Sequence, residues 1–117
     1  MKEISEMTNE ELNYAVAVEV MGWSKESNEH GQKIYTNADG YEYVGNWLPT
    51  THIFSAWQVV ERMRKDKWWY EIYTEYTDPE YFAKFGSGDW PVYSSSCETQ
   101  QRAICEAALK AIRKGGP

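Results

Sequence analysis

This chain of 117 residues contains no long hydrophobic run. No apolar stretch approaches the ~20 residues that a membrane-spanning helix needs, and the mean hydropathy is -0.71. The N-terminus, residues 1–6, also lacks the apolar stretch behind a basic start that marks a secretory signal. We therefore expect neither a membrane anchor nor export.

Cysteine is equally scarce. The chain holds two cysteines, Cys97 and Cys105, which cannot form a disulfide framework. On one helix their eight-residue separation is a rise of about 12 Å, which is too far for a disulfide bond. Neither has a C-x-x-C partner of the kind that binds zinc. The sequence predicts two free thiols and no metal site.

Motifs of catalysis are missing as well. The chain has two histidines: His30 lies in a polar stretch, and His52 lies where a helix is expected to begin, as a cap residue rather than a base. No G-x-S-x-G, H-E-x-x-H or P-loop pattern occurs. We read the glycines of 86–88 as a hairpin turn, because a phosphate loop leads into a helix. Glu71 and Glu75 are read as a solvated strand face. We therefore expect no catalytic residue, no cofactor and no enzyme activity.

Acidic and aromatic side chains are what the chain has in excess. Eighteen acidic and twelve basic residues give a net charge of -6, which disfavours binding to the phosphate backbone of duplex nucleic acid. Six Trp, nine Tyr and three Phe make up 15% of the residues. This exceeds what one small core readily hides, and Trp and Tyr favour interfaces and stacking pockets. We expect a homo-oligomer, at least a dimer, with Trp or Tyr in the interface.

Apolar periodicity and turn residues predict one domain over residues 1–117, with residues 1–7 frayed. Two capping boxes are predicted, Thr8 with Glu11 and Ser95 with Glu98. The expected elements are a helix over 10–21, strands over 33–36 and 41–44, a helix from Thr50 or Thr51 to Asp66, strands over 68–76, 81–85 and 90–93, and a helix from 96 to 114. The order is α-β-β-α-β-β-β-α. Short links predict antiparallel pairing in an α+β fold.

The same periodicity predicts the core. On the second helix the expected buried stripe is Ile53, Ala56, Trp57, Val60 and Met63. Trp68 and Ile72 are expected in the core from the following strand. The buried stripe of the third helix is rich in alanine, from 103 to 111, which permits close packing against a neighbouring element or a second subunit.

Three segments, 20–23 (Val-Met-Gly-Trp), 54–61 (Phe-Ser-Ala-Trp-Gln-Val-Val-Glu) and 102–109 (Arg-Ala-Ile-Cys-Glu-Ala-Ala-Leu), show a family resemblance. Their order and spacing resemble the phage ABA sandwich domain over about residues 8–113. This resemblance implies a small phage protein with an antiparallel sheet layered between helices, and it says little about chemistry.

The fold group also resembles the phage anti-Thoeris sponge proteins. Those proteins bind a cyclic ADP-ribose signal, some also bind cyclic oligonucleotides, and they sequester the signal without cleaving it in pockets at subunit interfaces. The resemblance implies the same role for this chain in the cytoplasm of an infected bacterial host. The alternative is a phage accessory or structural protein whose aromatic surface binds protein.

A nucleotide site needs an aromatic face for the base and cations for the phosphates. Strand parity points Phe82 away from its apolar neighbours, and Arg113 ends the third helix. The predicted ligand-binding residues are Phe82, Arg113, Arg102, Trp23, Trp90 and Lys84.

Each of these assignments has an alternative that the sequence leaves open. A second helix layer would cover Phe82, and Trp23 would serve as a hydrophobic plug. Arg102 lies beside a buried stripe, where a charge calls for a partner. Lys110 and Lys114 are explained as well by the negative end of the helix dipole as by a phosphate site.

Overall fold

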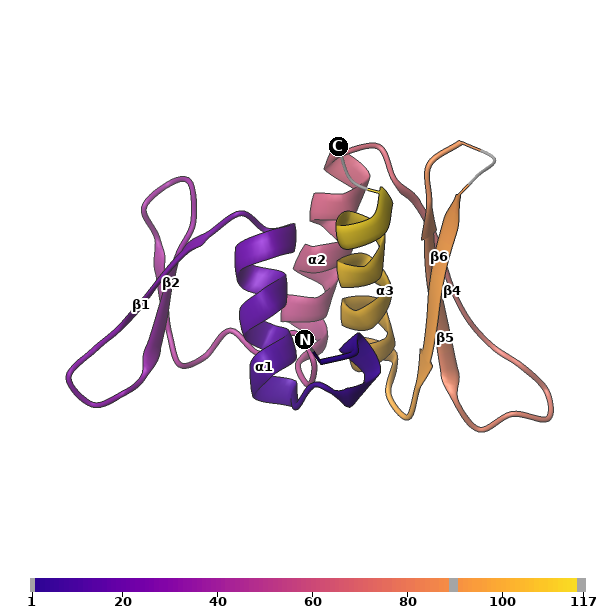
Figure 1. Ribbon diagram of the computed structural model, residues 1–117, viewed down its shortest axis with the longest axis horizontal. Helices are drawn as coiled ribbons and strands as arrows, with labels where there is room; N and C mark the ends of the chain where they lie inside the picture. Colours follow the sequence, from indigo (N-terminus) through magenta and orange to yellow (C-terminus); the bar gives the residue numbers. More distant parts are fainter. Residues whose placement is uncertain (1, 89–90, 116–117) are drawn as a thin grey trace.

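In the computed structural model, the helices occupy the middle of the molecule and a three-stranded sheet lies on either side of them (Figure 1). The structure describes residues 2–88 and 91–115. The elements are η1 (Ile4–Glu6), α1 (Asn9–Ala15), η2 (Val16–Val20), β1 (Ser24–Ser27), β2 (Lys33–Thr36), β3 (Glu42–Val44), α2 (Ile53–Lys65), β4 (Trp69–Thr74), β5 (Tyr81–Gly86), β6 (Val92–Cys97) and α3 (Gln100–Gly115). None of these helices is long and apolar enough to cross a membrane.

The predicted α+β class, the order of the predicted elements and their antiparallel pairing are confirmed. The structure adds β1 in a segment that the sequence predicts as a polar loop, because β1 pairs with β2 along its whole length. The layers differ from the expected sheet between helices, since here the helices lie between two sheets (Figure 1). Inward aromatic residues on the sheet β1–β2–β3, such as Tyr35, give that second sheet its own contact with the core.

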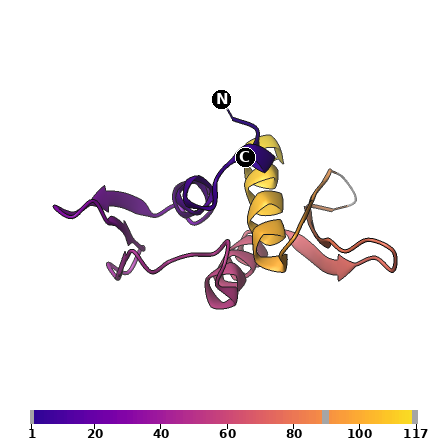
Figure 2. The same cartoon turned by 90° about the horizontal axis from the view of Figure 1, so that it is seen from below.

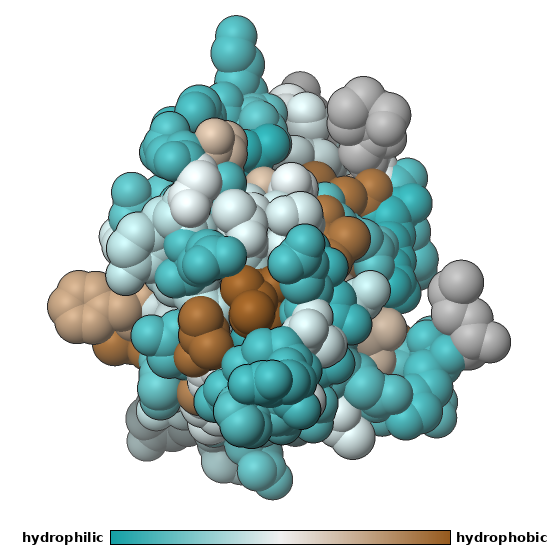
Figure 3. Space-filling model, turned by 90° about the vertical axis from the view of Figure 1, so that its left-hand side faces the viewer, coloured by the Kyte–Doolittle hydropathy of each residue, from teal (hydrophilic) through white to brown (hydrophobic). Residues whose placement is uncertain are grey.

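The outer face of the sheet β1–β2–β3 is directed to solvent. Figure 3 shows this side of the molecule as largely hydrophilic, with a few small hydrophobic groups. The inner face carries Tyr35, which is buried, and Tyr43, which packs against the core. The sheet is therefore amphipathic and covers the helix layer from one side.

The first helix begins as the sequence predicts. Thr8 Oγ1 accepts a hydrogen bond from the Glu11 N–H at 3.1 Å, and the Glu11 carboxylate accepts one from the Thr8 N–H at 2.9 Å. The bond from Thr8, followed by that from Lys2, lowers the pKa of Glu11 to about 2. The helix continues as the π-helical turn η2 and ends at Gly22, whose φ of 72° suits glycine. Residues 4–6, predicted as a frayed end, form η1.

The predicted beginnings of the other two helices are wrong. His52, not a threonine, occupies the cap position of α2 and makes no side-chain cap bond. Ser95 is a residue of β6, which stays paired with β5 as far as Cys97, so it cannot cap α3. Thr99 takes that role, since its Oγ1 accepts a hydrogen bond from the Arg102 N–H at 3.2 Å. Strand pairing is the long-range contact that overrides the local capping pattern.

The core includes residues of α1, η2, α2, α3 and both sheets. One part of it lies between α3 and the sheet β4–β5–β6. On α3, residues 103–109 are buried, and the inward side chains of β5, Ala83 and Phe85, are fully buried against them. The alanine stripe is therefore used inside the chain, where it allows a close approach of α3 to the sheet and to α2. Trp68 is buried as predicted.

On α2 the predicted stripe is only partly correct. Ala56, Val60 and Met63 are buried as expected. Ile53 and Trp57, also predicted as core, are 45% and 42% exposed. The helix is rotated so that Val59 is buried in their place. Both stripes are compatible with the helical period, and packing selects one of them.

Both cysteines are free and buried, although they do not share one helix, because Cys97 ends β6. Burial, together with the nearby Glu106, raises the pKa of Cys97 to about 12, and burial also raises the pKa of Cys105. At about pH 8 both groups are therefore protonated thiols, which are poor nucleophiles.

We predict that the native protein reacts slowly with a thiol reagent at about pH 8, and that two thiols per chain react rapidly once guanidinium unfolds it. Mass spectrometry of unreduced protein that is unfolded and alkylated should show two modified cysteines. Rapid modification of native protein, or a Cys97–Cys105 bond, would contradict the structure.

Candidate functional site

Phe82 lies on the side of the sheet β4–β5–β6 that faces away from the helices. Its neighbour Ala83 points to α3, so the alternation of the strand turns Phe82 outward, as predicted. Within the described residues no helix covers this face, which excludes the alternative of a second helix layer (Figure 1). The rings of Phe82 and Tyr73, opposite on β4, stack with centroids 5.2 Å apart and planes 11° apart.

Other aromatic and charged side chains adjoin this stack. Lys84 Nζ lies 3.4 Å from Glu71 Oε2 and 5.2 Å from the Tyr73 ring centroid. The predicted site residue Lys84 is thus beside the stack, and its charge is paired. Trp69 donates its indole N–H to the Gly88 carbonyl at 2.7 Å. We call Trp69, Tyr73 and Phe82 the outer aromatic face.

The position of Trp69 also explains why residue 86 of β5 is a glycine. Its ring crosses Gly86 so closely that a Cβ built there would lie 2.3 Å from the ring. Only glycine leaves room for this arrangement, and the indole is thereby held against the sheet. The outer aromatic face is therefore a fixed surface rather than a set of independent side chains.

A hollow of about 400 Å³ lies where β6, α3 and the N-terminal segment meet. We call it the Phe82 groove. Its lining includes Phe82, Glu106, Lys110, Lys114 and residues 94–96, three consecutive serines of β6. The groove thus combines an aromatic ring, two ammonium groups and several hydroxyls.

Of the groove residues, only Phe82 belongs to the predicted site, so the two lysines are among those that the sequence prediction did not select. They are one turn apart on α3, and Lys110 Nζ donates a hydrogen bond to the Ser94 carbonyl at 2.7 Å. An ammonium group has three donors, so Lys110 keeps two for a ligand. The spacing 102, 106, 110, 114 places four charged side chains on one face of α3. That i, i+4 pattern was the available signal for them.

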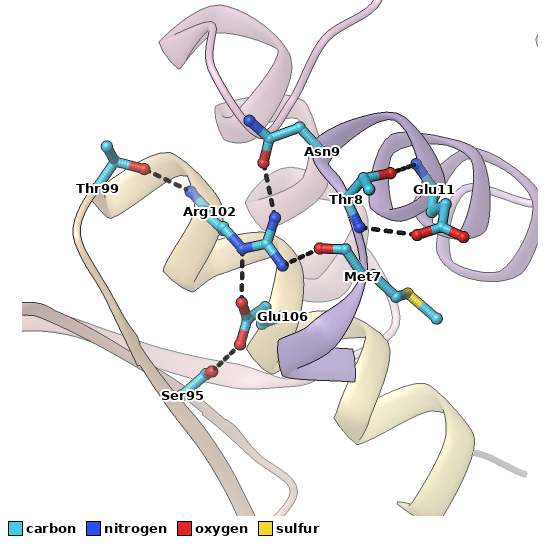
Figure 4. Close-up of polar contacts among 8 residues, drawn as sticks. All are labelled: Met7, Thr8, Asn9, Glu11, Ser95, Thr99, Arg102 and Glu106. Atoms are coloured by element: carbon cyan, nitrogen blue, oxygen red, sulfur yellow. Dashed lines mark hydrogen bonds and ion pairs between the residues drawn. The ribbon is translucent and has the colours of Figure 1, made fainter. Parts of the chain in front are cut away.

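The Arg102 guanidinium bonds to several partners within the chain (Figure 4). Its Nε donates to Glu106 Oε2 at 2.7 Å, its Nη1 to Asn9 Oδ1 at 2.7 Å and its Nη2 to the Met7 carbonyl at 2.6 Å. Glu106 accepts a further bond from the Ser95 hydroxyl at 2.7 Å. The two charged side chains are only 19% and 6% exposed. Each guanidinium nitrogen of Arg102 is thus engaged inside the chain.

Arg113 is also paired. It makes a two-point contact with Glu19 on η2, with Nε to Oε1 and Nη2 to Oε2 both at 2.8 Å. These hydrogen bonds raise the pKa of Arg113. Arg113 does not line the Phe82 groove, so one chain does not bring the predicted pair of Phe82 and Arg113 together.

Trp23 lies on the other side of the helix layer. It stacks on Tyr43 at 5.1 Å with a 7° interplanar angle and contacts Trp47 at 4.6 Å. It therefore fills the space between η2 and the sheet β1–β2–β3, as the plug alternative predicts. Trp90, the remaining predicted site residue, lies outside the described residues.

These observations define the class of the protein: an α+β domain with helices between two antiparallel sheets, and with an aromatic and basic groove at a sheet edge. Within the described residues no group of three or more His, Cys, Asp or Glu could hold a metal ion. Residues 14–109 match the family model of the phage ABA sandwich domain. The chain belongs to this family of phage proteins, as the sequence resemblance indicates.

A solved structure has the same fold. The chain is similar to a phage protein from Bacillus cereus ATCC 14579, whose crystal structure is known at 2.0 Å. The two share 23% sequence identity over 96% of this chain and 99% of that chain, with a TM-score of 0.72. No curated protein matches this chain.

The Arg102 network generates a prediction about stability. Arg102→Met leaves the Glu106 carboxylate buried without its counter-charge, which costs about 3–5 kcal/mol of the free energy of unfolding. Urea unfolding followed by tryptophan fluorescence measures it. Adding Glu106→Leu to the first substitution should recover much of the loss, because no unpaired charge is then buried. A loss below about 1 kcal/mol in the single variant would show that the Arg102–Glu106 ion pair contributes no more to stability than a solvent-exposed pair.

Proposed function

We propose that this phage protein is a non-enzymatic binding protein that sequesters a cyclic nucleotide immune signal, of the cyclic ADP-ribose type or a cyclic oligonucleotide, in the cytoplasm of the infected host. The observation that carries the proposal is the Phe82 groove, in which an aromatic ring and two cations line the same hollow. The family resemblance to signal-binding sponge proteins agrees with it.

The groove has the chemistry that such a ligand requires. A base stacked on Phe82 contributes roughly 1–3 kcal/mol. Lys110 and Lys114 supply ammonium donors for phosphates, and the serine hydroxyls donate or accept hydrogen bonds. The volume of about 400 Å³ lies within the roughly 300–1,000 Å³ typical of small-molecule sites.

The net charge of -6 does not prevent an anion from binding here. Glu106, the buried carboxylate of the groove, is compensated by Arg102 at 2.7 Å, so it does not cancel the charges of Lys110 and Lys114. Acidic groups elsewhere on the surface are screened beyond about 8 Å at physiological ionic strength. Glu3 also lines the groove. With Glu106 paired to Arg102, the two lysines and Glu3 leave a net positive charge there, which favours a phosphate.

The groups in the groove support sequestration rather than cleavage. The Ser95 hydroxyl donates a hydrogen bond to Glu106, but that carboxylate also accepts a hydrogen bond from Arg102 Nε and is engaged in this ion pair. The two histidines are both exposed and lie away from the groove, at position 30 and at the cap of α2. A nucleophile with an activating base is the arrangement that hydrolysis needs.

A thermal-shift screen with cyclic ADP-ribose isomers and cyclic di- and trinucleotides tests the proposal. A ligand at one hundred times its Kd stabilises the folded state by about 2.7 kcal/mol. Chromatography should recover the bound nucleotide unchanged. No shift with any of these nucleotides, or recovery of a converted product, would overturn the proposal.

Calorimetric titration of variants tests the groove itself. Phe82→Ala should weaken binding roughly 5- to 150-fold, which corresponds to one lost stack. Lys110→Ala and Lys114→Ala should each weaken it as well, whereas Lys65→Ala, on α2, is the matched control and should not. Unchanged affinity in the three groove variants would refute this site. The same titration tests the ligand-binding roles that the sequence predicts for Arg113, Arg102, Trp23, Trp90 and Lys84.

A second function, that of a phage accessory or structural protein that binds another protein, is favoured by the outer aromatic face. Trp69, Tyr73 and Phe82 are half-buried, and no helix within the described residues covers them. Aromatic side chains of this kind are enriched in protein interfaces. This function would be supported if the wild-type chain bound a phage protein and none of the nucleotides, and if the variant Tyr73→Ala no longer bound that phage protein.

A further inference from the structure

A second cavity lies on the other side of the helix layer, between α1 and the sheet β1–β2–β3. Figure 2 shows α1 end-on between this sheet and α3. The cavity has a volume of about 440 Å³, within the roughly 300–1,000 Å³ typical of small-molecule sites. We call it the α1 pocket. Its lining includes Glu10, Asn13, Lys33, Tyr35, Trp47 and Leu48, and it shares no lining residue with the Phe82 groove.

Asn13 brings an amide group to the wall of this pocket. The residue is only 6% exposed. Its Oδ1 accepts a hydrogen bond from the Thr50 N–H at 3.0 Å, which fixes the orientation of the amide. Its Nδ2 has no hydrogen-bond partner within the described residues, and it is not among the atoms that are fully enclosed without a partner. Two N–H donors of a nearly buried side chain are therefore left for whatever enters the pocket.

The Tyr35 hydroxyl is the second polar group that the pocket leaves unused. Tyr35 is 4% exposed, and in the part of the chain that the structure describes its hydroxyl makes no hydrogen bond. Burial, followed by the nearby Glu10, raises the pKa of Tyr35. At about pH 7 the group is therefore a neutral hydroxyl, which can donate or accept a hydrogen bond.

The remaining wall is apolar, and its charges compensate each other. Trp47 is 1% exposed, and its indole N–H donates to Gln58 Oε1 at 2.8 Å, so Trp47 offers the pocket ring atoms only. Glu10 Oε1 lies 3.7 Å from Lys33 Nζ. An ion that entered the pocket would lose its hydration without gaining a net counter-charge. The pocket therefore favours an uncharged ligand with an apolar body.

We propose that the α1 pocket is a binding site for a small uncharged molecule that carries an amide or lactam group on an aromatic ring. The carbonyl oxygen of the ligand accepts a hydrogen bond from Asn13 Nδ2, and the N–H of the ligand donates to the Tyr35 hydroxyl. The ring of the ligand packs against Trp47. An amide has one acceptor beside one donor, which is the complement of what Asn13 and Tyr35 leave free. The proposal does not depend on nucleotide binding.

Three probes with one common ring test the chemical class: benzamide, benzoate and benzylamine. A fragment of this size is expected to bind with a Kd of roughly 1 mM, so titration extends to about 10 mM. In nitrogen-edited NMR spectra, benzamide should shift the Asn13 side-chain amide signals, which are assigned by their loss in Asn13→Asp. Benzoate and benzylamine should bind about tenfold more weakly or not at all. No shift with benzamide, or equal binding of either ion, would overturn the proposal.

Variants of the two polar groups test the site. Tyr35→Phe retains the ring and the fold and should weaken benzamide binding roughly 2- to 10-fold, the value of one hydrogen bond. Asn13→Asp retains the acceptor for the Thr50 N–H but loses the donor, so it should weaken binding as well. Tyr41→Phe is the matched control, because Tyr41 is 60% exposed and does not line the pocket. Unchanged affinity in Tyr35→Phe would overturn the proposal.

A variant of the Phe82 groove separates the two sites. Lys110→Ala should bind benzamide like the wild type, because Lys110 does not line the α1 pocket. Loss of benzamide binding in this variant would place the probe in the Phe82 groove and overturn the proposal. A chain that binds benzamide at Asn13 but none of the cyclic nucleotides would retain the α1 pocket and refute only the proposed sequestration.

Discussion

The ion pair between Arg102 and Glu106 is the interaction on which the rest of the molecule depends. It is nearly excluded from water, and it connects four separate parts of the chain: α3, β6 through Ser95, the start of α1 through Asn9, and the N-terminal segment through the Met7 carbonyl. A buried charge is tolerated only when it is paired and its remaining donors and acceptors are bonded. The pair satisfies this condition only when all four parts are in place.

This arrangement also shapes the candidate site. Since α3 is held against β6 at Arg102, its next two turns bring Lys110 and Lys114 along the edge of the sheet, and Lys110 bonds to the Ser94 carbonyl. The small side chains on the opposite face of α3 allow the helix to lie close to β5. Phe82 then reaches the groove from the middle strand, past the short serines of β6. The groove is thus a consequence of how closely α3 approaches the sheet.

The sequence by itself determined what depends on residues close together in the chain. The Thr8–Glu11 capping box follows from a spacing of three residues and the outward direction of Phe82 from strand alternation. The α+β order follows from apolar periodicity and turn residues. Only the tertiary structure decided two other features. The segment β1 is polar and forms a strand because it pairs with β2. The buried face of α2 is one of two possible apolar stripes, and the neighbouring elements select it. Asn9 and Met7, which bind Arg102, and Glu19, which binds Arg113, lie more than 90 residues away from those arginines. No local pattern encodes such contacts, because they form only when packing brings distant segments together.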